Sequence, residues 1–336
     1  MVKTGQIEEA KSVNLRKVQL FVLERLVWII AIASYTLFIF SSPRLFFTTS
    51  TIVDIFRIYA GYGILAVAVG ICLISGCIDL SLPAIGGLTG VFIVEFGEVW
   101  FPGAPGILLL FLPLIVGAAL GAMNGLISGR TGVHPFFITL ATSLLFQGVR
   151  KFIRPGSMWI QNSKILLLPN TEIIGGFTLS IALLLIVMFL AWLLLNHTHI
   201  GVRMYAVGGN AASARMMGIN VENMKLFVHT LAGAMAGLSG LIYVADVGAT
   251  SPEMMDLWLF WIFAMAVFGG IAIEGGRGNL ENVIAGVFFI GTLSYGAALL
   301  GVQVHLIASV VGILIFIGVI VNSIRDKIMD RLLMPS

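Results

Sequence analysis

The chain has 336 residues, of which 59% are hydrophobic and 10% charged, with 19 basic and 16 acidic side chains and a net charge of +3. A soluble domain carries about 25% charged residues, so this chain lacks the charge to cover a soluble surface of its size. The composition excludes a soluble enzyme, a disordered tail and a disulfide scaffold. Without a long basic run, it also argues against nucleic-acid binding.

Ten segments have the roughly 20 mostly apolar residues that a membrane helix needs. In chain order they are 25–42, 58–77, 81–97, 107–128, 135–150, 178–196, 226–245, 258–273, 281–300 and 304–323. The third, fifth and eighth are short or interrupted by Gly, Pro or a charge. A membrane tolerates such backbone only where protein or a water-filled cavity satisfies it. We therefore expect an all-α membrane protein of about ten transmembrane helices, with these three near a pathway.

The basic residues predict the orientation of these helices. With the N-terminus inside, thirteen of the nineteen Lys and Arg residues lie on the cytoplasmic side and six outside, so the positive-inside rule favours both termini in the cytoplasm. The expected organisation is a cytoplasmic segment 1–24, a transmembrane domain 25–323 and a cytoplasmic tail 324–336. Residues 1–24 are too long and polar for a signal-peptide n-region, which predicts a retained first anchor.

Small residues recur every four positions in two of the segments. Gly117, Gly121 and Gly125 do so in the fourth, and Gly233 and Gly237 in the seventh. Such faces let membrane helices approach closely. The pattern fits static packing and helices that slide during transport equally well. A faint repeat, an acidic turn followed by a helix that ends in Gly-Val-Phe, begins near Gly76 and again near Gly269 and predicts pseudo-repeated halves.

Groups for ion coupling or metal binding are scarce in the sequence. Each predicted span lacks Asp, Glu, Lys and Arg at its centre, which argues against an ion-coupled symporter. Cys72 and Cys77 form a C-x4-C pair, which is neither a zinc signature nor a disulfide framework, so both are expected to be packing residues and no metal site is predicted. The histidines, including His229, are expected to be structural or solvated.

The longest predicted cytoplasmic connection is 197–225, which is too apolar and too rich in Gly and Ala for a random linker. Residues Asn210 to Met217 are predicted to form a short helix, with Asn210 as its N-cap. A short amphipathic helix of this kind suits docking in a groove of a soluble partner.

The motifs of this loop and of three other segments resemble the permease subunits of ribose-type ABC importers. The loop reads GVRMYAVGGN from Gly201 and continues as AASARMMGINV. The other segments are SGCIDLS at 75–81, Asn124-Gly followed by PFFITLAT at 135–142, and the glycine turn 269–278. The resemblance covers about residues 60–300. It implies that the loop couples the membrane helices to an ATPase through Gly201, Arg203, Ala206, Gly208, Gly209, Asn210, Ala214, Arg215, Gly218 and Ile219.

The resemblance also implies partners. The chain has no P-loop motif, so it is expected to bind no cofactor and to be no enzyme itself. A separate ABC ATPase with two nucleotide sites would use ATP and Mg²⁺. The other expected partners are a second permease subunit, a periplasmic or extracellular sugar-binding protein and the bilayer of the bacterial inner membrane. The expected cargo is a monosaccharide or related polyol. The alternatives are a permease for branched-chain amino acids or nucleosides, and an ion-coupled transporter that works alone.

Polar and aromatic residues in or beside the irregular segments are candidates for a translocation pathway. They are Asp79, Ser81, Asn124, Phe136, Thr139, Gln147 and Trp261. The polar ones would hydrogen-bond a hydroxylated solute, or would cap half-helices and bridge neighbouring helices. The sequence departs from the family pattern at Leu82-Pro83, at Glu274 and after Asp256. There, Trp258, Phe260 and Trp261 would stack on a sugar or form an interfacial aromatic belt.

Overall fold

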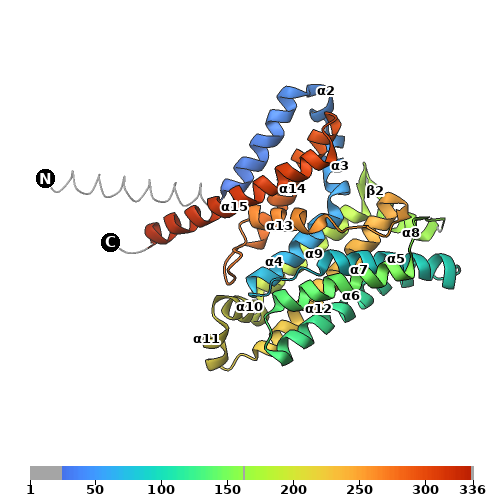
Figure 1. The fold of residues 1–336 in the computed structure, drawn as a ribbon. Helices are drawn as coiled ribbons and strands as arrows, with labels where there is room; N and C mark the ends of the chain where they lie inside the picture. The colour runs from blue at the N-terminus through green and yellow to red at the C-terminus, as the bar shows by residue number, and fades with distance from the viewer. Residues whose placement is uncertain (1–24, 162, 334–336) are drawn as a thin grey trace.

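The computed structural model describes residues 25–161 and 163–333, which fold almost entirely into helices (Figure 1). The first helix is Arg25–Ser41. It is followed by α2 Pro43–Phe46, α3 Thr49–Ile58, α4 Ala60–Ile74, α5 Leu82–Val94 with its π-helical extension η1 Glu95–Trp100, α6 Gly106–Thr131, α7 Pro135–Ile153, α8 Ser163–Asn170 and α9 Leu179–His197. The remaining helices are α10 His199–Gly209, α11 Ala211–Met216, α12 Val221–Val247, α13 Trp258–Phe268, the 3₁₀ turn η2 Leu280–Asn282, α14 Val283–Leu299 and α15 Val304–Leu333.

Seven helices in the described residues are long and apolar enough to cross a membrane, and an eighth span results if α3 and α4 are taken as one helix bent by 56°. Two shorter apolar helices, Arg25–Ser41 and α13, occupy the remaining predicted segments. Each of the ten predicted segments therefore coincides with a helix or a bent pair. The all-α membrane class is confirmed, while the count of ten spans and the orientation stay predictions.

Several predicted boundaries differ from the observed ones: α12, for example, begins at Val221 and not at 226, and three differences change how a segment is interpreted. The third segment continues to Trp100 through the π-helical turns of η1. The eighth is shorter than predicted, because α13 ends at Phe268 and the glycines from Gly269 onward form a turn. The last helix runs on to Leu333, so the predicted start of a tail at residue 324 does not coincide with a helix end.

The glycine faces predicted in the fourth and seventh segments bring α6 and α12 into backbone contact. A Cβ added at Gly117 would overlap the carbonyl of Gly233, and one at Gly121 would overlap the carbonyl of His229. A Cβ at Gly237 would overlap the carbonyl of Pro113 in the same way. The predicted close approach is therefore confirmed at this pair of helices.

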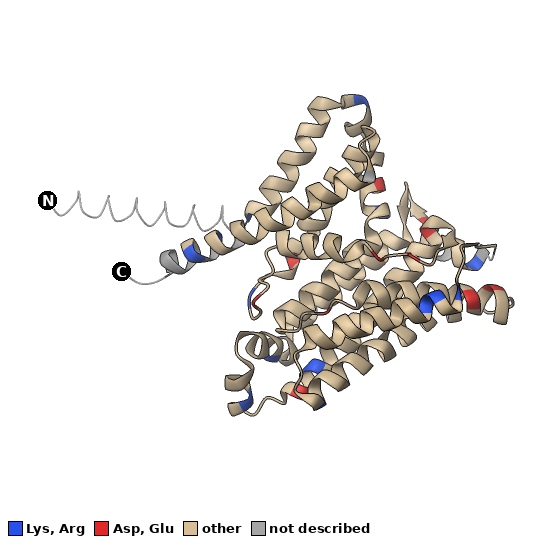
Figure 2. Cartoon of the chain, in the orientation of Figure 1, with Lys and Arg blue, Asp and Glu red and all other residues tan. Residues whose placement is uncertain are grey.

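Helix α12 lies at the centre of the molecule, packed against α4, α5 and α6. The side chains of α4 are buried almost without exception, which explains why this segment is hydrophobic all round. Charged residues lie mostly at helix ends and in connecting segments (Figure 2). The interior is thus an apolar bundle, and the polar groups inside it are exceptions.

In the described residues the helices are interrupted by two very short antiparallel strand pairs, and β2 lies at the end opposite α10 and α11 in Figure 1. They pair β1 Met158–Trp159 with β4 Ala249–Thr250, and β2 Glu172–Ile174 with β3 Phe177–Thr178.

The predicted orientation places Arg150 among the basic residues outside the membrane, but its side chain is fully buried. It binds Asp256 at 2.6 Å and donates to the carbonyls of Pro252 and Met254 at 3.0 and 2.6 Å. The C-terminal part of α7 is thereby fixed to the segment that leads into α13.

Candidate functional site

Most of the loop 197–225 folds into two short helices, α10 and α11, that lie together at one end of the bundle, and its last residues from Val221 already belong to α12 (Figure 1). Helix α10 begins where the Thr198 hydroxyl accepts from the backbone N–H of Gly201. Helix α11 begins where the Asn210 side chain accepts from the N–H of Ser213 at 2.9 Å. The predicted short helix and its Asn210 cap are therefore confirmed.

The surface of α11 is both apolar and charged. Met216 and Met217 are exposed at its end, and Arg215 forms an ion pair with Glu222 at the start of α12. The predicted residues Arg203 and Gly209 are also exposed, whereas Gly201 and Ala214 are buried. The predicted coupling residues thus divide into an exposed set and a set that packs against the bundle.

Gly208 joins α10 directly to two turns of the bundle, the first glycine turn at 75–81 and the second glycine turn at 269–278. A Cβ at this position would overlap the carbonyl of Ile74, the last residue of α4, and would lie 2.7 Å from the N–H nitrogen of Gly276. The same Gly276 N–H donates to the Ile74 carbonyl at 2.9 Å. Gly76 and Gly275 flank this point with φ values of 69° and 91°, which favour glycine. Three motifs that are far apart in the sequence therefore meet through their backbones.

A side-chain bond reinforces this junction. The Tyr205 hydroxyl on α10 donates to the carbonyl of Gly278 at 2.9 Å. Burial raises the pKa of the Tyr205 phenol above its usual value, so the hydroxyl stays protonated and able to donate at neutral pH. The helix α10 is thus tied to the second glycine turn at two points.

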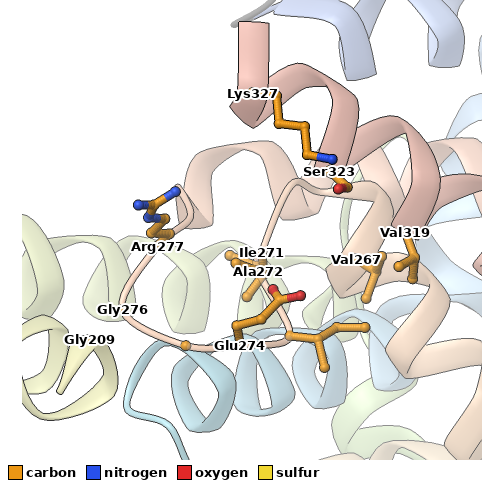
Figure 3. A pocket seen from close by; sticks show the side chains of 12 residues that line it. Gly209, Val267, Ile271, Ala272, Glu274, Gly276, Arg277, Val319, Ser323 and Lys327 are labelled. Atoms are coloured by element: carbon orange, nitrogen blue, oxygen red, sulfur yellow. The ribbon is translucent and has the colours of Figure 1, made fainter. Parts of the chain in front are cut away.

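A cavity of about 470 Å³ lies between the second glycine turn and α15, beside Gly209 (Figure 3). Its apolar wall includes Val267 and Val319. Glu274, Arg277 and Lys327 are among the lining residues that carry charge. Glu274, a departure from the family pattern, is exposed here. Of the residues predicted for coupling, Gly209 therefore lines this cavity.

Four of the predicted pathway residues come together in a buried polar network. Asp79 accepts from the Ser81 N–H and hydroxyl at 2.8 and 2.6 Å, and Asn124 donates to the Ser81 hydroxyl oxygen at 2.8 Å. The Thr139 hydroxyl oxygen accepts from the N–H of Leu80 at 3.1 Å. The network ties the turn between α4 and α5 to α6 and α7, so these side chains bridge helices.

The other three predicted pathway residues lie outside this network and are half-buried. Phe136 packs edge-on against Phe137, and the Gln147 amide donates to Ser143 on its own helix. Trp261 faces Tyr62 with their ring centroids 6.2 Å apart. The structure thus brings only Asp79, Ser81, Asn124 and Thr139 together.

Two features of the interior have no counterpart in the predicted site. His229 on α12 is fully buried, and its Nδ1 lies 2.7 Å from a carboxylate oxygen of Asp79. Trp258 is also buried and stacks on Tyr62 with a centroid separation of 3.4 Å, so it does not belong to a lipid-facing aromatic belt. His229 and Asp79 are 150 residues apart, a separation that local motifs do not bridge.

Long apolar helices with a helical pair at one end define a multi-pass membrane protein. The family model described as branched-chain amino acid transport system / permease component matches residues 51–320. Because the match covers most of the chain, the chain belongs to this family. No solved structure matches the chain.

Curated relatives of the chain are sugar permeases of bacteria. The ribose import permease protein RbsC of Escherichia coli (strain K12) is 30% identical over 84% of this chain and 88% of the relative. The D-allose transport system permease protein AlsC of the same strain is 31% identical, over 85% and 87%. The ribose import permease protein RbsC of Bacillus subtilis (strain 168) is 33% identical, over 81% and 84%. The chain is therefore similar to permease components along nearly their whole length.

Proposed function

We propose that the chain is the membrane-spanning permease subunit of an ATP-driven importer that moves a monosaccharide or a related polyol across the bacterial inner membrane. The observation that carries the transport mechanism is the backbone junction at Gly208, where α10 meets the ends of both glycine turns. A movement imposed on α10 and α11 would pass directly to α4 and to the segment between α13 and α14. Coupling of this kind needs a partner that moves the two short helices.

The proposed partners follow from this arrangement. A cytoplasmic ABC ATPase would bind the exposed part of the loop, namely Arg203, Gly209, Arg215 and the methionines after it, next to the cavity beside Gly209. ATP and Mg²⁺ would be used by that subunit. A second permease subunit and an extracytoplasmic sugar-binding protein would complete the transporter. In this arrangement both termini lie in the cytoplasm, and the number of spans is ten.

The ATPase interface is tested by co-purification of the assembled transporter. Replacing Gly209 by Phe and Arg215 by Ala together should lower the recovered ATPase at least about tenfold, as is typical for loss of central interface residues, while the permease still inserts. Glu222→Gln is the matched control, because it breaks the same ion pair but keeps Arg215. Undiminished ATPase in the double variant would contradict this interface.

The sugar assignment rests on the names of the relatives, whose printed substrates are ribose, allose and fructose. The family description favours branched-chain amino acids as the second candidate. The binding protein that co-purifies with the transporter should therefore be screened against D-ribose, D-allose, D-fructose, L-leucine and a nucleoside. We expect the binding protein to bind a monosaccharide and none of the other compounds. Binding of L-leucine would instead assign the transporter to branched-chain amino acids. Uptake by the isolated chain in liposomes under an ion gradient would instead indicate secondary transport.

A further inference from the structure

A second, smaller cavity lies between the C-terminal end of α12 and the β1–β4 strand pair. Its volume is about 200 Å³. The predicted orientation places this part of the chain outside the membrane, on the side where a solute would enter. Six of the residues that line the cavity come from three short segments, namely Ser157 and Trp159, Tyr243 and Val247, and Ala249 and Ser251.

The strand geometry explains why these residues share one face. Trp159 pairs with Ala249 across the two strands. Because successive side chains of a strand alternate between its faces, Ser157 lies on the face of Trp159, and Ser251 on that of Ala249. Tyr243 and Val247 are four residues apart on α12 and so lie on one side of that helix. The cavity is therefore enclosed between one face of the strand pair and one face of α12.

The lining suits a neutral ring that carries hydroxyl groups. Trp159 is 78% exposed, so its indole is open to a ligand. The face of an aromatic ring is partially negative and attracts the C–H groups of a sugar. Within the described part of the chain, the hydroxyls of Ser157, Tyr243 and Ser251 form no hydrogen bond. Each can therefore donate to, or accept from, a hydroxyl of the ligand.

The lining of the cavity contains no charged side chain among the described residues. An amino acid such as L-leucine carries an ammonium and a carboxylate group, and moving them out of water is costly unless charged or hydrogen-bonding groups compensate both. A sugar needs no such compensation. The chemistry of the cavity thus favours an uncharged, hydroxylated solute on grounds that are independent of the names of the relatives.

We propose that this cavity is the first site in the permease at which the monosaccharide binds, against Trp159, once the binding protein has released it. This inference rests on the proposed function and adds to it the place where the solute enters.

Aromatic side chains continue from the cavity into the bundle. The ring of Tyr243 packs edge-on against Trp258 with their centroids 5.1 Å apart, and Trp258 stacks on Tyr62. Trp261, one of the predicted pathway residues, lies 6.2 Å from Tyr62 between ring centroids. The cavity thus adjoins α13, one of the three irregular segments that the sequence places near a pathway.

Saturation-transfer NMR on the full-length permease, with D-ribose, D-allose and L-leucine as probes, tests the site without requiring transport. We expect transfer to the sugars and none to L-leucine. Trp159→Ala should weaken sugar binding by about tenfold, as is typical for loss of a central aromatic contact, and its exposure means that the fold is retained. Ala249→Leu should fill the cavity and abolish the transfer. Ala298→Leu is the matched control, because it adds the same side chain at an exposed position on α14.

Equal transfer to the sugars in the wild type, Trp159→Ala and Ala249→Leu would overturn the proposal. Transfer to L-leucine that Ala249→Leu abolishes would also overturn it. A Trp159→Ala protein that loses affinity only for the binding protein would assign this face to that partner and refute the sugar site.

Uptake by the assembled transporter separates failure of the site from failure of the proposed function. Sugar uptake that is equal in the wild type and in both cavity variants would refute the site and leave the function standing. Sugar transfer in the NMR experiment without sugar uptake by the wild type would support the site and contradict the function.

Discussion

Arg150 and Lys151 are neighbours in the sequence but lie in opposite surroundings. The guanidinium of Arg150 is fully buried and bonds to Asp256 and two carbonyls, whereas Lys151 is exposed. A planar group with several fixed donors can satisfy all three acceptors at once. Arg150 therefore anchors a connection, although its position in the sequence suggests an ordinary loop charge.

Replacing Arg150 by Gln should destabilise the protein by about 3–5 kcal/mol, because it leaves Asp256 without its charged partner. Lys151→Gln should change stability by no more than about 0.5 kcal/mol, as is usual on an exposed surface. Thermal unfolding in detergent compares the two variants. Equal melting temperatures would show that the buried pair adds no stability.

Gly208 and Gly209 offer a similar comparison at the coupling junction. A Cβ at Gly208 meets backbone atoms of α4 and of the second glycine turn, whereas one at Gly209 meets no atom of the described residues within 4 Å. Gly208→Ala should therefore destabilise by about 1–3 kcal/mol through overpacking, and Gly209→Ala should not. Proteolysis of the loop in the purified protein measures the effect, and equal protection in both variants would contradict the tight contact.

At the scale of elements, helix positions were predictable because most of the apolar segments are about as long as a bilayer is thick. The short helix after Asn210 was predictable from the Gly- and Ala-rich composition of the loop together with its Asn210 cap. The end of α13 was not, because Gly269 and Gly270 continue an apolar run in which only backbone geometry separates helix from turn. The contact between α6 and α12 was predictable in kind, since glycines at every fourth position favour close approach.

A glycine inside the α6–α12 contact and a glycine outside it should respond in opposite ways to replacement by alanine. Gly121→Ala should destabilise by about 1–3 kcal/mol, because its Cβ would overlap the backbone of α12. Gly148→Ala, on α7 with open space around it, should stabilise by up to about 1 kcal/mol through helix propensity. Unfolding in a denaturing detergent compares the stability of the two variants with that of the wild type. A stable Gly121→Ala protein would mean that the two helices are not in backbone contact.

At the scale of the whole molecule, α10 and α11 lie at one end and β2 at the other (Figure 1). The sequence assigns these ends to opposite sides of the membrane. The sequence could not identify His229 as a partner of Asp79, because the two residues are 150 positions apart. A lone histidine in an apolar segment does not indicate which residue it will contact.

Cysteine labelling tests this topology, since both native cysteines are buried. Met216→Cys on α11 should react with a membrane-impermeant maleimide only in inside-out vesicles, because the positive-inside rule places it in the cytoplasm. Ser157→Cys, exposed before β1, should react only in intact spheroplasts. Labelling of both from the same side would refute the predicted orientation.

The junction at Gly208 consists of main-chain atoms on all three of its sides. Side chains between two elements can absorb a small displacement, because they can change rotamer while the backbone stays in place. At this junction carbonyl, amide and Cα groups are in direct contact with no side chain between them. A displacement of one element therefore displaces the neighbouring element directly. A movement of α10 of the kind proposed above would therefore pass directly to the end of α4 and to the segment between α13 and α14.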